Sequence, residues 1–565
     1  MLKTWRGNPW AIIVVLCLGY FATLMDLTIV NIAVPQMTDD LNASLDQILW
    51  VFNSYALGLA VLLITAGRLG DLLGKKNVFI AGVVVFTLAS LACGLAQDPA
   101  QLIAFRAVQG VGGALLVPQT LSIIADVFPA SKRGAALGIW GAVAGLSAIA
   151  GPVVGGALVT SFDWRWIFLI NVPIGVAVVA LAGPVIPRSI RQAGHKLDIT
   201  GVLIVSMSLF CLAFGLIQGE RYGWNAWVWG LLALSVVLFL AFVAQQSRVQ
   251  DDDPLVPFSL FKDRAFSIVN AISIVVSFGA IGLFLPMTVY LQSVLGFSAV
   301  KTGGVLLPMA IGGLIVAVPA GVLSERYGGK YVLIAGLSTF GIGLAWLVAV
   351  AQTDSTWTAF IAPFFVVGLG SGCSFTPMAS EVMRKVPAHL NGAASGVNNA
   401  MRHVGAVLAG AVIGAVLQNR LAASLTSQAN EHAAALPEEY REGFIAGFAE
   451  SGAEGLNVGA SGASSVGVPE GMPDAVAAEI QAVAGQVFAE GYVAALTPTL
   501  LVAVAALAAG VLGCFALKAY TGPVANPYGL PVVDDAEPGS AEHELEETAE
   551  PAPTVSTADN TGSGH

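Results

Sequence analysis

Apolar residues along the chain fall into blocks of about 20 residues, and short polar breaks separate the blocks. An α-helix of this length spans the hydrocarbon core of a bilayer, so each block predicts one membrane-crossing helix. There are fourteen such blocks, at residues 10–34, 49–66, 78–96, 101–124, 134–157, 166–186, 198–218, 226–244, 266–290, 303–324, 331–351, 357–380, 393–417 and 496–519. The pattern therefore predicts an all-α polytopic membrane protein.

The distribution of basic residues predicts the orientation of these helices. With the N-terminus inside, 18 of the 25 Lys and Arg lie on cytoplasmic segments and five lie outside, while Arg106 and Arg402 fall within apolar blocks. Cytoplasmic loops of membrane proteins carry an excess of Lys and Arg. Because the number of spans is even, we expect both termini on the cytoplasmic side of a plasma membrane.

Composition agrees with a membrane protein and argues against nucleic acids and cysteine-bound metal ions as its partners. The chain is 56% hydrophobic and 11% charged, whereas soluble proteins carry about 25% charged residues. The net charge of −11 comes mostly from two segments outside the spans, 421–495 and 521–565. No basic patch indicates nucleic-acid binding, and the five cysteines form neither a disulfide framework nor a metal-binding pattern. We expect 521–565 to be an acidic, disordered cytoplasmic tail.

An internal repeat divides the chain. GRLGDLLGKK (67–76) matches GVLSERYGGK (321–330) at a shift of 254, and GAALG (134–138) matches GAASG (392–396) at a shift of 258. Two six-helix halves are predicted, with two helices inserted between them. The boundaries are 1–190, 191–250 and 251–520. Transporters with parallel repeats bind substrate near the bilayer midplane, between the halves. Since no Walker motif is present, an ion gradient is the expected energy source.

Five motifs carry a resemblance to a known family. They are MDLTIVNIAVP (25–35), GRLGDLLGKK (67–76), LIAFRAVQGVGGA (102–114), GLSAIAGPVVGG (145–156) and WRWIFLINVPIG (164–175). In this order and topology they resemble the major facilitator superfamily, and within it the fourteen-helix drug:proton antiporter group of multidrug-efflux-type permeases. The resemblance implies the major facilitator fold and a monomeric transport unit that is not an enzyme. It also implies that the protein uses the proton gradient, needs no cofactor, and has the bilayer, protons and small organic substrates as its partners.

Two buried charges in the first half are candidates for proton coupling. Asp26 lies about 13 Å from the outer end of the first span and Arg106 about 8 Å into the fourth, so the two side chains can meet. Burial disfavours the charged form of the carboxyl group, and a nearby arginine favours it. Because these two effects oppose each other, they can balance the ionised and protonated forms of Asp26, so that it exchanges a proton. The alternative is a static buried ion pair. Asp26 has no carboxylate counterpart in the second half, which favours coupling.

The loop motif joins Gly67, Asp71, Gly74, Lys75 and Lys76. Its aspartate is placed to pair with cations or to cap a helix N-terminus at the cytoplasmic side. We interpret the motif as a conformational latch that stabilises the outward-open state. The alternative, chiefly for the two lysines, is simple anchoring by the positive-inside rule.

The motif in the fifth span contains Gly151, Pro152, Gly155 and Gly156. Small residues allow helices to approach closely in lipid, and proline bends a helix. The resemblance implies a bend that limits proton leak and favours exchange over symport. Generic close packing is the alternative.

Three further polar residues are candidates for substrate binding or coupling: Asn31, Arg402 and His403. An arginine inside a span is a functional candidate by default. Arg402 could bind an anionic substrate group or anchor to backbone carbonyls. His403 could titrate near neutral pH or serve as an ordinary hydrogen-bonding residue.

The long segment 418–495 is predicted to be an external loop, either a cap or a flexible insert, with helical spacing over 473–496. The function that these features favour is proton-coupled export of small amphipathic or cationic organic compounds, such as drugs and antibiotics. The alternatives are a dedicated exporter of one metabolite or lipid, a proton symporter, and a non-transporting membrane receptor or scaffold.

Overall fold

The computed structural model describes residues 7–187, 196–219, 222–453 and 474–518. Contacts divide the chain into a unit Met1–Thr521 and a unit Gly522–His565. Since the second unit lies outside the described residues, so does the predicted tail, and the account below concerns the first unit alone.

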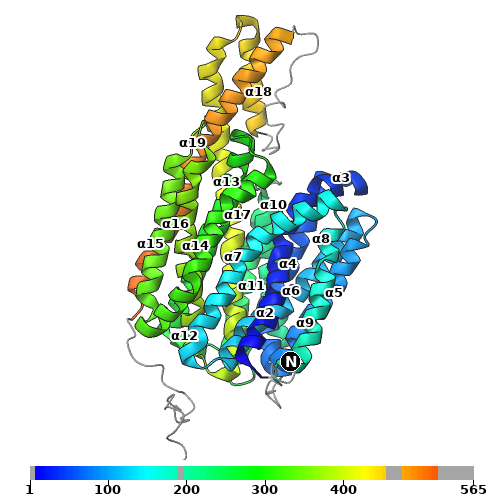
Figure 1. Ribbon diagram of the computed structural model, residues 1–565, viewed down its shortest axis with the longest axis vertical. Helices are drawn as coiled ribbons and strands as arrows, with labels where there is room; N and C mark the ends of the chain where they lie inside the picture. Colours follow the sequence, from blue (N-terminus) through cyan, green and yellow to red (C-terminus); the bar gives the residue numbers. More distant parts are fainter. Residues whose placement is uncertain (1–6, 188–195, 220–221, 454–473, 519–565) are drawn as a thin grey trace, which may run out of the picture. The chain divides into compact units, whose positions relative to one another are not determined.

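The first group of helices packs around α4 and α6 (Figure 1). It comprises α2 (Pro9–Ile29), η1 (Val30–Ala33), α3 (Val34–Leu41), α4 (Leu45–Leu73), α5 (Lys75–Gly94), α6 (Pro99–Val127), α7 (Ala130–Ser161), α8 (Trp166–Leu169) and α9 (Asn171–Val185). Local sequence sets where these helices begin. Ser44 and Gln47 form a capping box at the start of α4, and the side chain of Asp98 accepts from the Gln101 amide at the start of α6.

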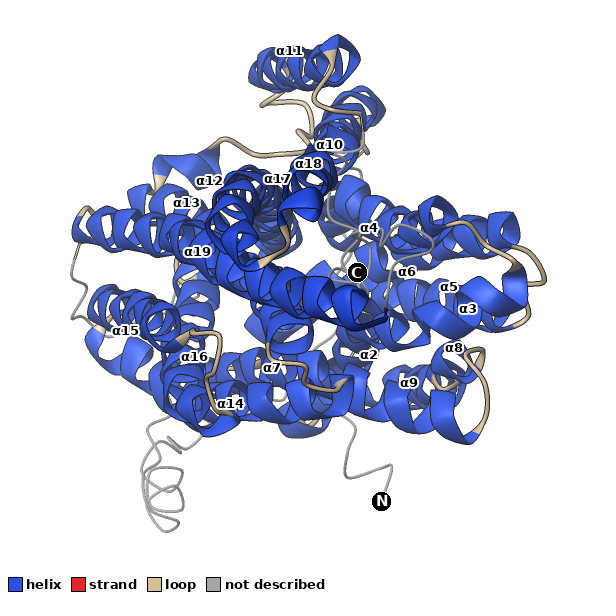
Figure 2. Ribbon diagram, turned by 90° about the horizontal axis from the view of Figure 1, so that it is seen from above, coloured by secondary structure: helices blue, strands red, loops and turns tan. Residues whose placement is uncertain are grey.

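Two helices follow that belong to neither group. They are α10 (Ile199–Gly219) and α11 (Ala226–Arg248), and Figure 2 shows them beside the rest of the bundle. Ser208 and Ser235 each donate to the other's carbonyl oxygen at 2.9 Å, which joins the pair. Helix α10 contacts both α4 and α17, so the inserted pair covers a seam between the two groups.

The second group packs around α14, α16 and α17. It comprises α12 (Ser259–Lys262), α13 (Arg264–Val289), η2 (Tyr290–Val294), α14 (Ala299–Tyr327), α15 (Gly329–Val350), η3 (Trp357–Phe360), α16 (Ile361–Met383), η4 (Ala388–Leu390), α17 (Asn391–His432), η5 (Ala433–Ala435), α18 (Glu438–Ala453) and α19 (Asp474–Phe515). Gly74 in the first group and Gly328 in the second join consecutive helices with φ of 92° and 83°. Glycine adopts this backbone without strain, which explains its presence in both copies of the loop motif.

Every predicted span coincides with a long helix. Within the described residues, thirteen helices are long and apolar enough to cross a membrane. Helix α7 is not among these thirteen, but its 32 residues cover the predicted span 134–157. Regular structure in the described ranges is therefore entirely helical, with the long helices where the hydrophobic blocks predicted them.

The segment predicted as an external loop, 418–495, is largely helical. Helix α17 continues to His432, α18 follows, and α19 begins at Asp474, while residues 454–473 lie outside the description. Figure 1 shows these yellow and orange helices extending past the ends of α13 and α14. They share a core that includes Leu425, Phe444 and Phe488. Because a flexible insert would bury no such core, we call this extension (418–453 and 474–495) the helical cap.

The repeated motifs of the two groups contact each other. Both contacts lie at the end of the bundle where α4 meets α5, which we call the basic end. A Cβ on Gly67 would collide with the carbonyl oxygen of Gly392, and a Cβ on Gly134 would collide with that of Gly321. Backbone therefore touches backbone at both places. The loop motif of each group packs against the GAALG or GAASG segment of the other group.

Candidate functional site

Asp26 on α2 and Arg106 on α6 meet in the interior of the first group. Their exposed fractions are 0% and 1%. Nη1 of Arg106 donates to Oδ2 of Asp26. The amides of Gln109 and Asn171 each donate to Oδ1 of Asp26 at 3.0 Å. With three donors on two oxygens, this geometry fits an ionised carboxylate, which only accepts hydrogen bonds.

Arg106 also has partners other than Asp26. Nη1 donates to Oε1 of Gln109 at 2.8 Å, and Nε donates to the carbonyl oxygen of Val51 at 3.1 Å. Its guanidinium carbon lies 4.2 Å from the centre of the Tyr55 ring, a distance at which a cation is attracted to the ring face. The guanidinium would therefore stay solvated by protein groups if the carboxylate became neutral.

Asn171 on α9 connects the charge pair to a third helix, and its amide oxygen can still accept a hydrogen bond. Its amide nitrogen donates to Asp26 and, at 3.1 Å, to Oγ of Ser90. Ser90 accepts from Gln109 as well and donates to the carbonyl of Phe168. The amide oxygen of Asn171 is buried, and it has no hydrogen-bond partner among the residues that the structure describes. A buried acceptor normally has a partner. This oxygen could therefore accept a hydrogen bond from a hydroxyl group, which the ionised carboxylate of Asp26 does not have.

Asp71 caps a helix of the other group. Its Oδ1 accepts from the amide of Gly392 at 2.9 Å and its Oδ2 from the amide of Ala393 at 2.8 Å. These are free amides in the first turn of α17, where the helix dipole favours an anion. The loop motif of the first group thus binds α17 at the basic end.

The two lysines of the loop motif bind different elements. Lys75 donates to Oδ2 of Asp126 at 2.6 Å and to the carbonyl of Ala388, which precedes α17. Lys76 donates to the carbonyls of Gly183 and Ile186, at the end of α9. Lys75 therefore joins Asp71 in bridging the two groups.

The glycines of the fifth-span motif bring α7 against α2. A Cβ on Gly151 would collide with Oγ1 of Thr28, and one on Gly155 would lie 2.8 Å from Cγ1 of Ile29. Gly156 has open space beside it. Pro152 lies within α7, but its side chain is outside the described part. The contact is made two and three residues after Asp26, so α7 packs directly beside the buried charge pair.

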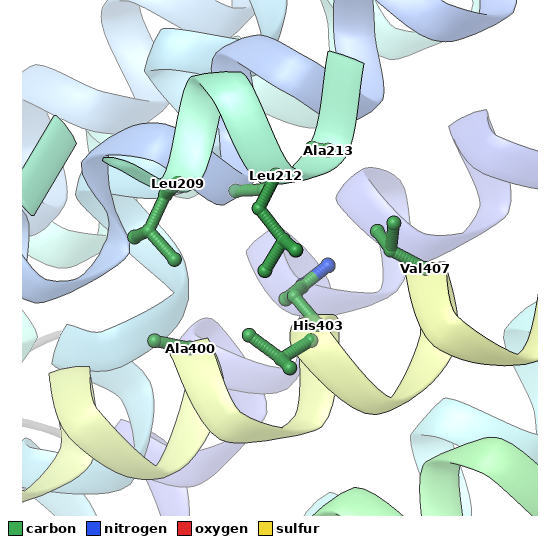
Figure 3. Close-up of a pocket in the computed structure, with 8 residues that line it drawn as sticks. Leu209, Leu212, Ala213, Ala400, His403 and Val407 are labelled. Atoms are coloured by element: carbon green, nitrogen blue, oxygen red, sulfur yellow. The ribbon is translucent and has the colours of Figure 1, made fainter. Parts of the chain in front are cut away.

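The three further candidates lie in different environments: Asn31, Arg402 and His403. Asn31 is exposed, and its amide donates to the carbonyl of Thr28 at 3.3 Å. Neighbours on a helix point about 100° apart, and accordingly Arg402 faces Trp140 of the first group. His403 instead lines an apolar pocket between α17, α4 and α10 (Figure 3). The pocket residues are Ala60, Leu209, Leu212, Ala213, Ala400, His403, Val404 and Val407.

Comparison with known proteins agrees with the fold. The model of the Major Facilitator Superfamily matches residues 16–410. The chain belongs to this superfamily. An MFS-type transporter of Mycobacterium tuberculosis, Rv1250, is 38% identical over 79% of this chain and 78% of its own length. The tetracenomycin C resistance and export protein of Streptomyces glaucescens is 36% identical, covering 74% and 77%.

Two further matches extend the comparison. Multidrug resistance protein 3 of Bacillus subtilis is 32% identical over 72% of this chain and 78% of its own length. The crystal structure of the human organic anion transporter MFSD10 matches with a TM-score of 0.57 at 10% identity, covering 90% and 99%. At this identity the second match supports the fold alone. As a superfamily member with fourteen long helices in its described part, the chain is a multi-pass membrane transporter rather than an enzyme, and it needs no cofactor.

Sequence reasoning missed the amides around the charge pair. Gln109 follows Arg106 by three residues, which places it on the same face of the helix. Asn171 lies within the motif WRWIFLINVPIG. Both positions could have been flagged as polar residues inside spans. Ser90 offers no such signal, since a lone serine in an apolar span commonly bonds its own helix.

Proposed function

We propose that this superfamily member is a proton-coupled antiporter that exports small amphipathic organic compounds, drugs and antibiotics among them. Asp26 is the proton-binding residue and Arg106 its partner. The observation that carries the proposal is that Arg106 pairs with a fully buried carboxylate and also donates hydrogen bonds to Gln109 and to the carbonyl of Val51. A static ion pair needs no additional hydrogen-bond acceptors. An arginine whose ion pair opens in every transport cycle needs them while the pair is open.

The surroundings of Asp26 suit both of its protonation states. The ionised form accepts from Arg106, Gln109 and Asn171. When Asp26 takes up a proton, a half-turn of the Asn171 amide presents its unpartnered oxygen to the new hydroxyl group. Protonation of Asp26 would thus give a partner to an oxygen that has none in the ionised state, and a buried polar group without a partner is costly in a low-dielectric site.

The basic end faces the cytoplasm in this proposal, with both termini on that side, because most Lys and Arg fall there. The contacts of Asp71 and Lys75 with the start of α17 then belong to a state closed toward the cytoplasm. Opening must break the Asp71 cap, and such caps are worth about 0.5–2 kcal/mol. The motif therefore acts as a latch that is remade in each cycle, while 1–190 and 251–520 rock as two halves.

The named activities of two relatives support export. One is described as a tetracenomycin C resistance and export protein and another as a multidrug resistance protein. The first of these favours a second candidate, a dedicated exporter of a single metabolite. The breadth of resistance on expression in a sensitive host separates the two, because a dedicated exporter protects against one compound class.

The central test uses everted membrane vesicles with an imposed pH gradient. We expect the wild type to accumulate substrate to a ratio whose logarithm rises with the imposed pH gradient, and we expect Asp26→Asn to lose this dependence. A receptor or scaffold on the same fold would show no gradient-driven accumulation in either form.

A further inference from the structure

A second charge, Arg402, lies at the interface between the two groups and has no role in the proton site. Building on the proposed antiport, we propose that Arg402 and its aromatic neighbours bind substrates that combine a planar aromatic system with an anionic oxygen. The chemical class is that of aromatic carboxylates and phenolates. This narrows the amphipathic or cationic class that the sequence favoured.

The position of Arg402 fits a central substrate site. It lies eleven residues into α17, which is about 16 Å along the helix axis. This depth is about half of a hydrocarbon core of roughly 30 Å. Substrate sites in transporters with repeated halves lie near the midplane.

Aromatic side chains from both groups surround the guanidinium. Its carbon lies 5.6 Å from the Trp140 ring on α7 and 5.1 Å from the Phe375 ring on α16. The hydroxyl of Tyr20 on α2 interacts with it as well. Tyr20 and Trp140 stack with centroids 4.6 Å apart and planes 9° apart. Trp140 is held in place by a 2.9 Å hydrogen bond from its Nε1 to Thr120.

In the described part of the chain, the Arg402 guanidinium has no anionic partner. Nε of Arg402 is buried and finds no hydrogen-bond partner in the described ranges. Within the described residues, no carboxylate forms an ion pair with Arg402 and no backbone carbonyl accepts from it. The anchoring role that the sequence left open is therefore not found in this part of the chain. Ring faces compensate a buried cation only in part, so the remaining donors are available to a ligand.

The chemistry of the guanidinium selects the ligand. Its planar fork of N–H groups matches a carboxylate with two parallel hydrogen bonds and stacks on aromatic faces. A cationic compound would meet like-charge repulsion here. The carboxylate of Asp26 could not relieve this repulsion, because Arg106 already holds it. An aromatic anion thus satisfies the charge and the rings together.

The test compares three probes that share one ring system: 9-anthracenecarboxylate, 9-anthracenemethanol and 9-(aminomethyl)anthracene. The full chain is reconstituted in proteoliposomes, and KM is measured for each probe under a pH gradient. We expect the wild type to favour the carboxylate. Arg402→Gln should raise KM for the carboxylate by about tenfold or more, the usual loss for a charge-assisted hydrogen bond, with the alcohol little affected. Arg402→Lys should recover part of the loss, since it keeps the charge without the fork.

Arg420→Gln is the matched control. Arg420 is exposed on the same helix, 18 residues further on. That is five turns, so it lies on the same face about 27 Å away. The control makes the same chemical change and should leave all three KM values unaltered.

Two results would overturn the inference: a wild type that prefers the ammonium probe, or an Arg402→Gln variant that loses all three probes equally. Failure of the antiport proposal looks different. In that case the pH gradient drives none of the probes, yet binding of the carboxylate, followed by anthracene fluorescence, still depends on Arg402. Such a result would sustain the anion site while refuting proton coupling.

Discussion

The substitution Asp26→Asn removes a charge and a titratable proton while keeping the shape of the side chain. The Asn amide can still accept from Gln109 and Asn171, which now donate to Oδ1. Arg106 loses its anion but keeps Oε1 of Gln109 and the carbonyl of Val51. An unpaired buried charge costs about 3–5 kcal/mol when nothing replaces its partner. Because these partners remain, we expect the loss of stability to fall below that range and the variant to fold.

The effect on coupling follows from the proton gradient. One pH unit corresponds to about 1.36 kcal/mol per proton, or about tenfold in a concentration ratio. For one proton exchanged per substrate molecule, a gradient of two units sustains an accumulation of about 100-fold. A variant without the proton site should equilibrate its substrate at a ratio of about one, while substrate exchange without a gradient continues.

The assay measures the steady accumulation ratio in everted vesicles as the imposed pH gradient is varied. Asp40→Asn serves as the control, since Asp40 is a half-exposed aspartate that pairs with Arg165 at 3.3 Å. It should retain the wild-type slope. If the Asp26→Asn variant accumulates substrate with the wild-type dependence on the gradient, the proton is carried elsewhere and the reasoning fails. A thermal-unfolding scan of the purified variant checks that loss of coupling is not loss of fold.

Three further substitutions test the remaining contacts. Asp71→Ala removes an N-cap worth about 0.5–2 kcal/mol, so pulsed EPR between labels on the basic ends of the two halves should show more of the open form; an unchanged distribution would contradict the latch. Gly151→Val forces a side chain into Thr28, and transport should fall sharply while Gly156→Ala, at a position with open space, stays active. Asn171→Leu removes a donor to Asp26 and the unpartnered oxygen, so the pH at which transport is half-maximal should shift; identical pH profiles would exclude the amide from proton exchange.

The sequence predicted the spans because blocks of about 20 apolar residues have one solution in lipid. It also placed Asp26 and Arg106 at similar depths, and the structure joins them. The depth of a residue in the membrane does not tell in which direction around the helix axis its side chain points. Arg402 and His403 are consecutive in sequence, yet one faces the interface between the groups and the other a pocket beside α10.

Other features depend on which helices become neighbours. The amide of Asn171 contributes to the Asp26 site only because α9 lies against α5 and α2. The sequence left open whether 418–495 is a cap or a flexible insert and indicated helical spacing only over 473–496, because Gly and Glu interrupt its apolar residues and no block of membrane-spanning length appears. The core of the helical cap forms when the extensions of α17 and α19 meet, which is information that a single helix does not carry.

Helix α7 contacts the basic end, the surroundings of Arg402 and the surroundings of Asp26. Its Gly134 lies against Gly321 of the other group at the basic end, Trp140 lies over Arg402, and Gly151 lies against Thr28 close to Asp26. The 17 residues from Gly134 to Gly151 span about 25 Å along the helix. A shift of α2 on protonation of Asp26 would press on Gly151, and a continuous helix would carry the displacement to Trp140 beside Arg402 and to Gly134 at the basic end. Because glycine contacts leave no side chain to absorb movement, close packing transmits such a shift rather than damping it. On this reasoning Gly151→Val should alter the EPR distances at the basic end as well as transport, whereas local damage near Asp26 would leave those distances unchanged.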